Sequence, residues 1–223
     1  MMDGVHCYVL PDAQHLRILA IEAGPVATNG YMLMDMNMHS AIIIDAPYQS
    51  VNAFCSFAEE NGLHITGLWL THSHWDHTAD AEICAEKGWD ILIHPDDEYR
   101  LLDQSAHTVW PLPFTLGNII PTGRINHGDI LTCGDWNCMV LHTPGHTEGG
   151  VCFVDSMHSC AFVGDTLFSG SIGRTDLPGG NTDTLLASIA EQLMKLSDDI
   201  TVFPGHGPLT TIGEERQNNP FLQ

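Results

Sequence analysis

Three histidines and an aspartate crowd into one short stretch of this chain, directly after an apolar run. The apolar letters "ITGLWL" lead into "THSHWDH", which spans Thr71 to His77. A short continuous apolar run predicts a buried strand, and His72 and His74, two residues apart in extended chain, project to the same side. Asp76 follows where a helix is expected to begin, so it can turn back toward the same point. This stretch therefore demands a fold in which a buried strand ends at a polar site.

The rest of the chain alternates between apolar runs and helical patterns. Apolar runs bounded by Gly, Pro, Asn and Asp predict strands, and apolar side chains at helical spacing with Gly or polar residues at the ends predict helices. Strands are expected at 16–23, 30–35, 41–46, 65–71, 90–95, 138–142, 150–155, 160–165 and 200–207, helices at 50–62, 78–88 and 181–196, and irregular chain at 103–128. Because strands and helices alternate in both halves, the sequence predicts a layered α/β protein.

Composition limits what this chain can do. A length of 223 residues predicts a single domain, and a formal charge of −21 argues against nucleic acid and acidic membranes as partners. No apolar stretch approaches the ~18 residues of a membrane span. An N-terminus without basic residues before Arg17 argues against a signal peptide. Seven cysteines, an odd number, predict reduced thiols and a cytoplasmic protein.

Further candidate ligands stand at the ends of other expected strands. His146 lies in the turn "HTPGHTEGG", Asp165 follows "FVG", and His206 lies in "FPGHGP". Layered α/β proteins build their sites at strand ends, so these side chains are expected to converge with those of the opening motif. Imidazoles and carboxylates without thiolates suit Zn, Fe or Mn. Seven such ligands exceed one tetrahedral site and suit two ions that share a carboxylate.

These residues resemble the metallo-β-lactamase fold superfamily, whose hallmark is HxHxDH followed by His, Asp and His at strand ends. The resemblance covers nearly the whole chain. It implies a four-layer αβ/βα sandwich in which two facing mixed sheets are flanked by helices. It also implies two divalent metal ions, with zinc favoured over iron or manganese. The resemblance assigns His72, His74 and His146 to the first ion, Asp76, His77 and His206 to the second, and Asp165 to both as a bridge.

Within that superfamily the chain is most similar to glyoxalase II, or hydroxyacylglutathione hydrolase, and its shorter bacterial relatives. The segments "TNGYML", "GDTLFSGSIGRTDLPGG" and "GHGPLTTIGEERQNNPFL" carry this similarity. It implies hydrolysis of S-(2-hydroxyacyl)glutathione, such as S-lactoylglutathione, by a metal-bridging hydroxide that Asp76 orients. It also implies that Arg174 holds the glycine carboxylate of glutathione. Only 17 residues follow His206, so the helical C-terminal domain of full-length glyoxalase II is expected to be absent, which puts glutathione specificity in question.

Several alternatives stay open at this stage. A persulfide dioxygenase with a single iron shares "GRTD" and HxHxDH. A β-lactamase is disfavoured because its common form has a cysteine where Asp165 stands, and a non-catalytic binding protein is disfavoured because all seven ligands are present. Arg174 has a structural alternative, an ion pair with Asp176 or Asp183. The expected partner is a small-molecule thioester, and the oligomeric state is open, with a homodimer among the alternatives.

Two further residues near the motif have open roles. Asp45, in "IIIDAP", either orients a metal-bound histidine or forms a turn. His142 lies near the expected site and is interpreted as structural, with a supporting role for the ligands as the alternative. The remaining histidines are also interpreted as structural: His6, His15, His39, His64, His94, His107, His127 and His158.

Overall fold

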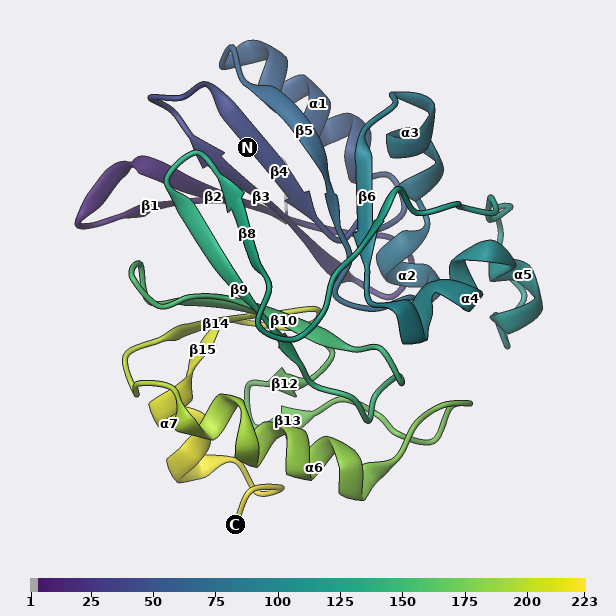
Figure 1. The fold of residues 1–223 in the computed structure, drawn as a ribbon, viewed down its shortest axis with the longest axis vertical. Coiled ribbons are helices and arrows are strands. Elements are labelled where there is room, and N and C mark those ends of the chain that lie inside the picture. Colours follow the sequence, from purple (N-terminus) through teal and green to yellow (C-terminus); the bar gives the residue numbers. More distant parts are fainter. Residues whose placement is uncertain (1–3) are drawn as a thin grey trace.

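A computed structural model describes residues 4–223, which build two facing sheets and a small hairpin (Figure 1). The first sheet has seven strands in sequence order, antiparallel from β1 to β4 and parallel from β4 to β7. Its strands are β1 (Val5–Leu10), β2 (Ala13–Ala23), β3 (Thr28–Asp35), β4 (Ser40–Ile44), β5 (His64–Trp69), β6 (Asp90–Ile93) and β7 (Gly123–Arg124).

The second sheet has six strands in the order β15-β14-β11-β10-β9-β8, of which only β14 and β11 pair in parallel. Its strands are β8 (Ile130–Cys133), β9 (Trp136–His142), β10 (Val151–Asp155), β11 (Cys160–Gly164), β14 (Thr201–Pro204) and β15 (Thr210–Thr211). The hairpin of β12 (Leu167–Phe168) and β13 (Ser171–Ile172) lies outside both sheets.

Helices cover the outer face of each sheet, as Figure 1 shows for α1 and α3 on one side and α6 and α7 on the other. Five helices lie between the strands of the first sheet in the chain: α1 (Val51–Glu60), α2 (Trp75–Thr78), α3 (Ala81–Glu86), α4 (Glu98–Leu102) and α5 (Gln104–His107). The second carries α6 (Thr182–Glu191) and α7 (Ile212–Asn218), and short 3₁₀ turns occur at Pro95–Asp97 and Leu193–Lys195.

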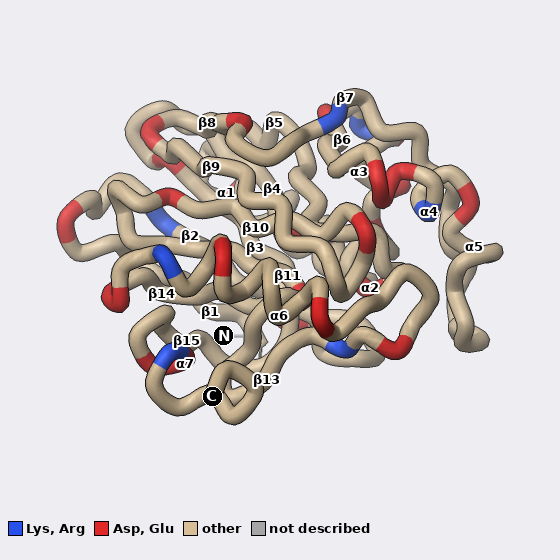
Figure 2. Tube along the Cα trace, turned by 60° about the horizontal axis from the view of Figure 1, so that its bottom comes forward, with Lys and Arg blue, Asp and Glu red and all other residues tan. Residues whose placement is uncertain are grey.

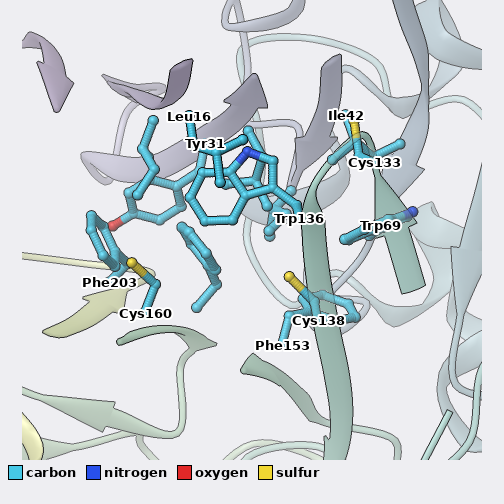
Figure 3. Close-up of a cluster of buried hydrophobic side chains, with 14 of the residues drawn as sticks. Leu16, Tyr31, Ile42, Trp69, Cys133, Trp136, Cys138, Phe153, Cys160 and Phe203 are labelled. Carbon is cyan, nitrogen blue, oxygen red and sulfur yellow. The ribbon is translucent and has the colours of Figure 1, made fainter. Parts of the chain in front are cut away.

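The strand alternation explains the layers. In β2, Leu16 and Ile18 face the cluster between the sheets, whereas Leu19 and Ile21 face the helices. Figure 3 shows the cluster between the sheets, where aromatic side chains from both sheets meet. Two further clusters pack the outer faces against the helices. The expected four-layer αβ/βα sandwich is therefore confirmed. Among residues 4–223, no helix is both long and apolar enough to cross a membrane.

Two expected helices are shorter than the sequence pattern predicted. The helix expected at 78–88 begins only at Ala81, as α3, and the separate helix α2 ends at Thr78. Asp80 lies between the two helices, and its carboxylate accepts the backbone N–H groups of Gln49 and Val51 and so holds the start of α1. The helix expected at 181–196 ends at Glu191 and continues as a 3₁₀ turn. The carbonyls of Met194 and Leu196 accept hydrogen bonds from Arg216 there.

Candidate metal centre

The seven predicted ligands follow strands of both sheets. His72 and His74 lie between the end of β5 and α2, and Asp76 and His77 lie within α2. Asp165 directly follows β11. The remaining two, His146 and His206, lie in the turns that follow β9 and β14. The two sheets thus bring their strand ends to one common edge, which is where the sequence predicted convergence.

The side chains converge in two groups. The first group comprises His72, His74 and His146, and the second comprises Asp76, His77 and His206. In the first group, His74 Nδ1 lies 2.8 Å from His146 Nε2. In the second, Asp76 Oδ2 lies 3.2 Å from His206 Nε2 and 3.5 Å from His77 Nε2. The ligand atoms of each group lie within 4.8 Å of one another, so each group can surround one ion.

Asp165 stands between the two groups. Its Oδ1 lies 3.2 Å from His77 Nε2, and its Oδ2 lies 3.4 Å from His146 Nε2 and 3.5 Å from His206 Nε2. A carboxylate has two oxygens with free lone pairs, whereas an imidazole offers one lone pair to a metal. The bridging role predicted from the sequence therefore has the geometry that it needs.

Several features of the protein fit a bound ion. Within residues 4–223, His72 Nε2, His77 Nε2 and Asp165 Oδ1 are buried and make no hydrogen bond, although buried polar atoms normally have partners. The histidine nitrogens and carboxylate oxygens of the predicted ligands lie 3.2–3.4 Å apart in three of these contacts. These distances match the roughly 3.3 Å expected between two ligand atoms around a tetrahedral zinc ion. A side-chain carbon at Gly205 would collide with Asp165 and His77, so glycine keeps the space between them open.

Asp45 orients one histidine of each group. Its carboxylate, 2% exposed, lies 2.7 Å from His77 Nδ1 and accepts hydrogen bonds from the backbone N–H and the hydroxyl of Thr71. Because the Thr71 hydroxyl donates to Asp45, its oxygen accepts from His72 Nδ1 at 3.1 Å. Both imidazoles therefore turn Nε2 toward the centre. Of the two roles considered for Asp45, the orienting role has the contacts, and its φ of 58° also marks a sharp turn.

His146 has its own orienting contact on the other side of the centre. Its Nδ1 donates to the backbone carbonyl of Arg174 at 2.7 Å, which leaves Nε2 facing Asp165. A side-chain carbon at Gly173 would collide with the Asp165 carbonyl and crowd the His146 ring. The glycine before Arg174 therefore lets the backbone approach close enough to hold this ligand.

Burial dominates the electrostatics of the first group. It lowers the pKa of His72 well below its usual range, and the positive charge of His77 lowers it further. Burial and the neighbouring His146 lower the pKa of His74 to about 3. Both imidazoles are therefore neutral near pH 7, with lone pairs ready for a cation.

Carboxylates dominate the second group. Burial opposes the effect, yet Asp165, Asp76 and Asp45 raise the pKa of His77 well above its usual range. Hydrogen bonds to Asp165 and Asp76 likewise overcome burial and raise the pKa of His206 to about 10. The same contacts hold the pKa of Asp76 at about 2 and that of Asp165 well below its usual range, against the effect of burial. Without metal, the protons on His77 and His206 thus balance the negative charges of Asp76 and Asp165.

Two supporting residues were missed in the sequence. Asp97, fully buried, accepts hydrogen bonds from the backbone and hydroxyl of Ser73, from Gly149 N–H and from Arg100. It thereby joins the HxHxDH loop to the His146 turn. The Thr28 hydroxyl donates to Asp76 at 2.8 Å. Asp97 follows a strand end, which was a usable signal, but nothing local to Thr28 predicted its contact with Asp76, 48 residues later.

The other candidates have different surroundings. Arg174 makes two hydrogen bonds, of 2.7 and 2.9 Å, to Asp176, which is the alternative considered from the sequence. It also lines the pocket above the centre, so its role toward a substrate stays a prediction. His142 stacks on His94 with ring centroids 4.0 Å apart and lies 3.0 Å from the Glu148 carbonyl through Nε2. Its contacts support the turn that holds His146.

A cavity of about 490 Å³ opens above the centre, within the usual range of small-molecule sites. Five of the predicted ligands line it: His74, Asp76, His146, Asp165 and His206. Residues 106–113 form one side. A small molecule in this cavity therefore lies directly against the predicted metal ligands.

Comparisons with known proteins show the family to which this chain belongs. The sequence model of the Metallo-beta-lactamase superfamily matches residues 23–206. The uncharacterized protein ML0493 of Mycobacterium leprae (strain TN) is 38% identical over 216 residues, covering 92% of this chain and 98% of that protein. The hydroxyacylglutathione hydrolase GloC of Haemophilus influenzae is 38% identical over 192 residues, covering 82% of this chain and 87% of that protein.

Solved structures show the same fold. The BLEG-1 B3 metallo-beta-lactamase superposes with a TM-score of 0.83 at 33% identity, covering 92% of this chain and 99% of that one. TTHA1623, in a di-iron-bound form, superposes with a TM-score of 0.79 at 32% identity, covering 91% and 99%. With its two ligand groups, which imply divalent metal ions, the chain is a metallo-hydrolase that belongs to the metallo-beta-lactamase superfamily.

Proposed function

We propose that this protein is a binuclear metal-dependent thioester hydrolase that cleaves S-(2-hydroxyacyl)glutathione, with S-lactoylglutathione as the reference substrate. The observation that carries the proposal is the position of Asp165, within 3.5 Å of His146 of the first group and of His77 and His206 of the second. Similarity to the hydroxyacylglutathione hydrolase GloC supports the thioester. Imidazole and carboxylate ligands suit zinc, and the di-iron form of TTHA1623 makes iron the alternative.

Water, rather than a protein nucleophile, has to attack the thioester. Among the described residues that line the cavity there is no cysteine. The two hydroxyls, of Ser73 and Thr108, already donate to Asp97 at 2.9 Å and to the Gln104 carbonyl at 2.8 Å. Two bound ions would supply an activated water and a positive charge for the developing oxyanion. The remaining steps depend on the chain's own residues.

Asp76 has the position to orient the attacking water. One of its oxygens accepts a hydrogen bond from Thr28, and the carboxylate borders the cavity. Because its pKa is about 2, it is ionised at neutral pH and acts as an acceptor. The water releases one proton to solvent as its oxygen bonds to the carbonyl carbon, and the C–S bond then breaks. The products are a thiolate and a carboxylic acid, which releases the remaining proton of the water. Since a thiol has a pKa near ~8.5, the leaving thiolate needs no dedicated general acid.

The test combines metal analysis with hydrolysis of S-lactoylglutathione by protein purified without chelator. We expect two ions per chain and turnover that a chelator abolishes and added metal restores. His64→Ala serves as the matched control for ligand variants, since His64 is exposed at the opposite end of β5. Two ions without thioester hydrolysis would contradict the proposal.

Two rival activities are separate arms of the same test. One iron per chain with oxygen uptake on glutathione persulfide would assign the protein to the dioxygenase class. Hydrolysis of a penicillin at a higher kcat/KM than any thioester would assign it to the β-lactamases. The similarity of this chain to BLEG-1, a B3 metallo-beta-lactamase, is the reason to measure that activity.

A further inference from the structure

One side of the cavity is markedly apolar. Eight consecutive residues, 106–113, line it and include only one ionisable side chain, that of His107. Val26 and Leu177 border the same space from other loops. We call Val26, Val109, Trp110, Leu112 and Leu177 the apolar wall. Val26, Val109 and Trp110 are 47%, 55% and 44% exposed, so these side chains have surface left to bury against a ligand.

The wall lies close to the metal centre. The guanidinium of Arg174 sits over the Trp110 ring, 5.4 Å from its centroid. The backbone carbonyl of the same Arg174 holds His146 at 2.7 Å. Trp110 is therefore linked to the predicted ligand His146 through a single residue, Arg174, and it lines the same cavity as the predicted ligands.

Arginine and lysine side chains are scarce in the cavity outside the predicted metal centre. Acidic residues are spread along the whole chain, whereas the basic ones are few and isolated (Figure 2). Of the two arginines that line the cavity, Arg100 is buried and bonded to Asp97, Glu148 and the Pro178 carbonyl. Arg174 pairs with Asp176 at the surface. Apart from the predicted metal centre, the cavity thus offers one exposed basic side chain with a permanent charge, Arg174, for a carboxylate, and an apolar wall for the rest.

We propose that the apolar wall binds the acyl arm of the thioester, so that the preferred substrates carry a branched or aromatic 2-hydroxyacyl group larger than lactoyl. This inference rests on the proposed thioester hydrolase activity. Glutathione, the thiol arm of the thioester, is poorly suited to the apolar wall. It bears two carboxylates and an ammonium group, which apolar side chains would desolvate. An alkyl or aryl group instead gains from burial against Trp110.

The experiment compares S-lactoylglutathione with S-(2-hydroxy-4-methylpentanoyl)glutathione, which adds three apolar carbons and leaves the reacting centre alike. Since one methylene in an apolar pocket changes kcat/KM by about tenfold or more, we expect the larger acyl group to be preferred by at least roughly tenfold. Trp110→Ala should remove most of that preference, while Trp110→Phe should keep it. Ile120→Ala is the matched control, because Ile120 belongs to the same irregular segment, is 80% exposed and does not line the cavity.

A second series replaces glutathione by the uncharged thiol N-acetylcysteamine and keeps each acyl group. If the wall binds the acyl arm, Trp110→Ala changes the acyl preference equally with both carriers. Two results would overturn the inference without contradicting the proposed thioester hydrolase activity. One is equal kcat/KM for the two acyl groups in the wild-type protein. The other is that Trp110→Ala changes only the preference between the two thiols. No hydrolysis of any thioester by the two-metal protein would overturn the proposed function and, with it, the inference.

Binding supplies a readout that is independent of turnover. The non-hydrolysable thioethers S-methylglutathione and S-(3-methylbutyl)glutathione are titrated into wild-type protein and Trp110→Ala by calorimetry. In the wild-type protein we expect the larger thioether to bind roughly tenfold more tightly than the smaller one. In Trp110→Ala we expect the two thioethers to bind with nearly equal affinity. Unchanged circular dichroism of Trp110→Ala, expected for a side chain that is 44% exposed, separates this result from misfolding.

Discussion

The first and second ligand groups share one centre, yet their protonation differs. The first group is buried among other imidazoles, so burial lowers the pKa of His72 and His74 and leaves both neutral. The second group lies among carboxylates, which raise the pKa of His77 and His206. The first group is therefore ready for a cation, whereas the second already balances its negative charge with protons.

This difference indicates how the centre fills. An ion at the first group meets neutral imidazoles and displaces few protons. An ion at the second group must displace protons from His77 and His206, which then become free to coordinate. We expect the first group to bind its ion more tightly near neutral pH. The following predictions test this comparison in order of decreasing effect.

The largest effect is expected for Asp165→Ala, because both groups contact this carboxylate. We expect loss of both tightly bound ions and a fall in kcat/KM of more than roughly a hundredfold, beyond the 10–100-fold effect typical of residues that only orient a ligand. Metal analysis after dialysis and the thioester assay measure the two losses. Full activity with two ions would exclude a bridge at Asp165.

A smaller and more selective effect is expected for His206→Ala. His206 contacts Asp76 and Asp165 and belongs only to the second group. Stoichiometry should therefore fall from two tightly bound ions to one, while His64→Ala keeps both. If both ions leave together in His206→Ala, the two groups are not independent and the comparison fails.

Asp45→Asn tests the contacts that orient the ligands. An amide cannot accept at both positions where the Asp45 carboxylate accepts, from Thr71 N–H at one oxygen and from the Thr71 hydroxyl and His77 at the other. Asparagine tolerates the positive φ of 58° at this position, so the backbone should persist. We expect metal affinity to fall roughly 10–100-fold, more for the second ion, because His77 contacts Asp45 directly. Titration with a competing chelator measures both affinities.

The pH dependence of metal affinity should separate the groups without a mutation. The pKa of His206 is about 10 and that of His74 about 3. Between pH 6 and pH 8 the second ion should therefore bind more tightly as pH rises, by roughly tenfold per pH unit for each proton displaced. Affinity for the first ion should change little. Calorimetry in buffers of different ionisation enthalpy counts the protons, and equal slopes for both ions would refute the assignment.

The smallest effect is expected for Arg174→Ala. The Arg174–Asp176 pair is exposed, and such pairs contribute about 0–1 kcal/mol, so a substrate carboxylate can replace Asp176. Losing a charged hydrogen bond of at least ~1.5 kcal/mol then lowers kcat/KM by roughly tenfold, with metal content unchanged. The loss should shrink for a thioester without the glycine carboxylate. Equal losses on both substrates, or lower thermal stability alone, would make Arg174 structural.

Much of the centre could be predicted because its signals are local. His72, His74 and His77 lie within six residues directly after an apolar strand, so their spacing alone predicts three ligands. The Pro-Gly-His turn at His206 can likewise be recognised from neighbouring residues. Helix ends were less predictable. The helix expected at 78–88 begins only after Asp80, whose carboxylate holds the start of α1 about thirty residues earlier, and such a contact leaves no trace in local spacing.

The sequence by itself determined the alternation of strands and helices and which side chains stand at the strand ends, since these depend on apolar periodicity and on neighbouring residues. Tertiary structure alone decided that Asp165 lies between the two groups, that Asp45 orients a histidine of each, and that Trp110 stands beside Arg174. These contacts join residues far apart in the chain, and they form only when two sheets pack through a shared core and bring their strand ends to one edge.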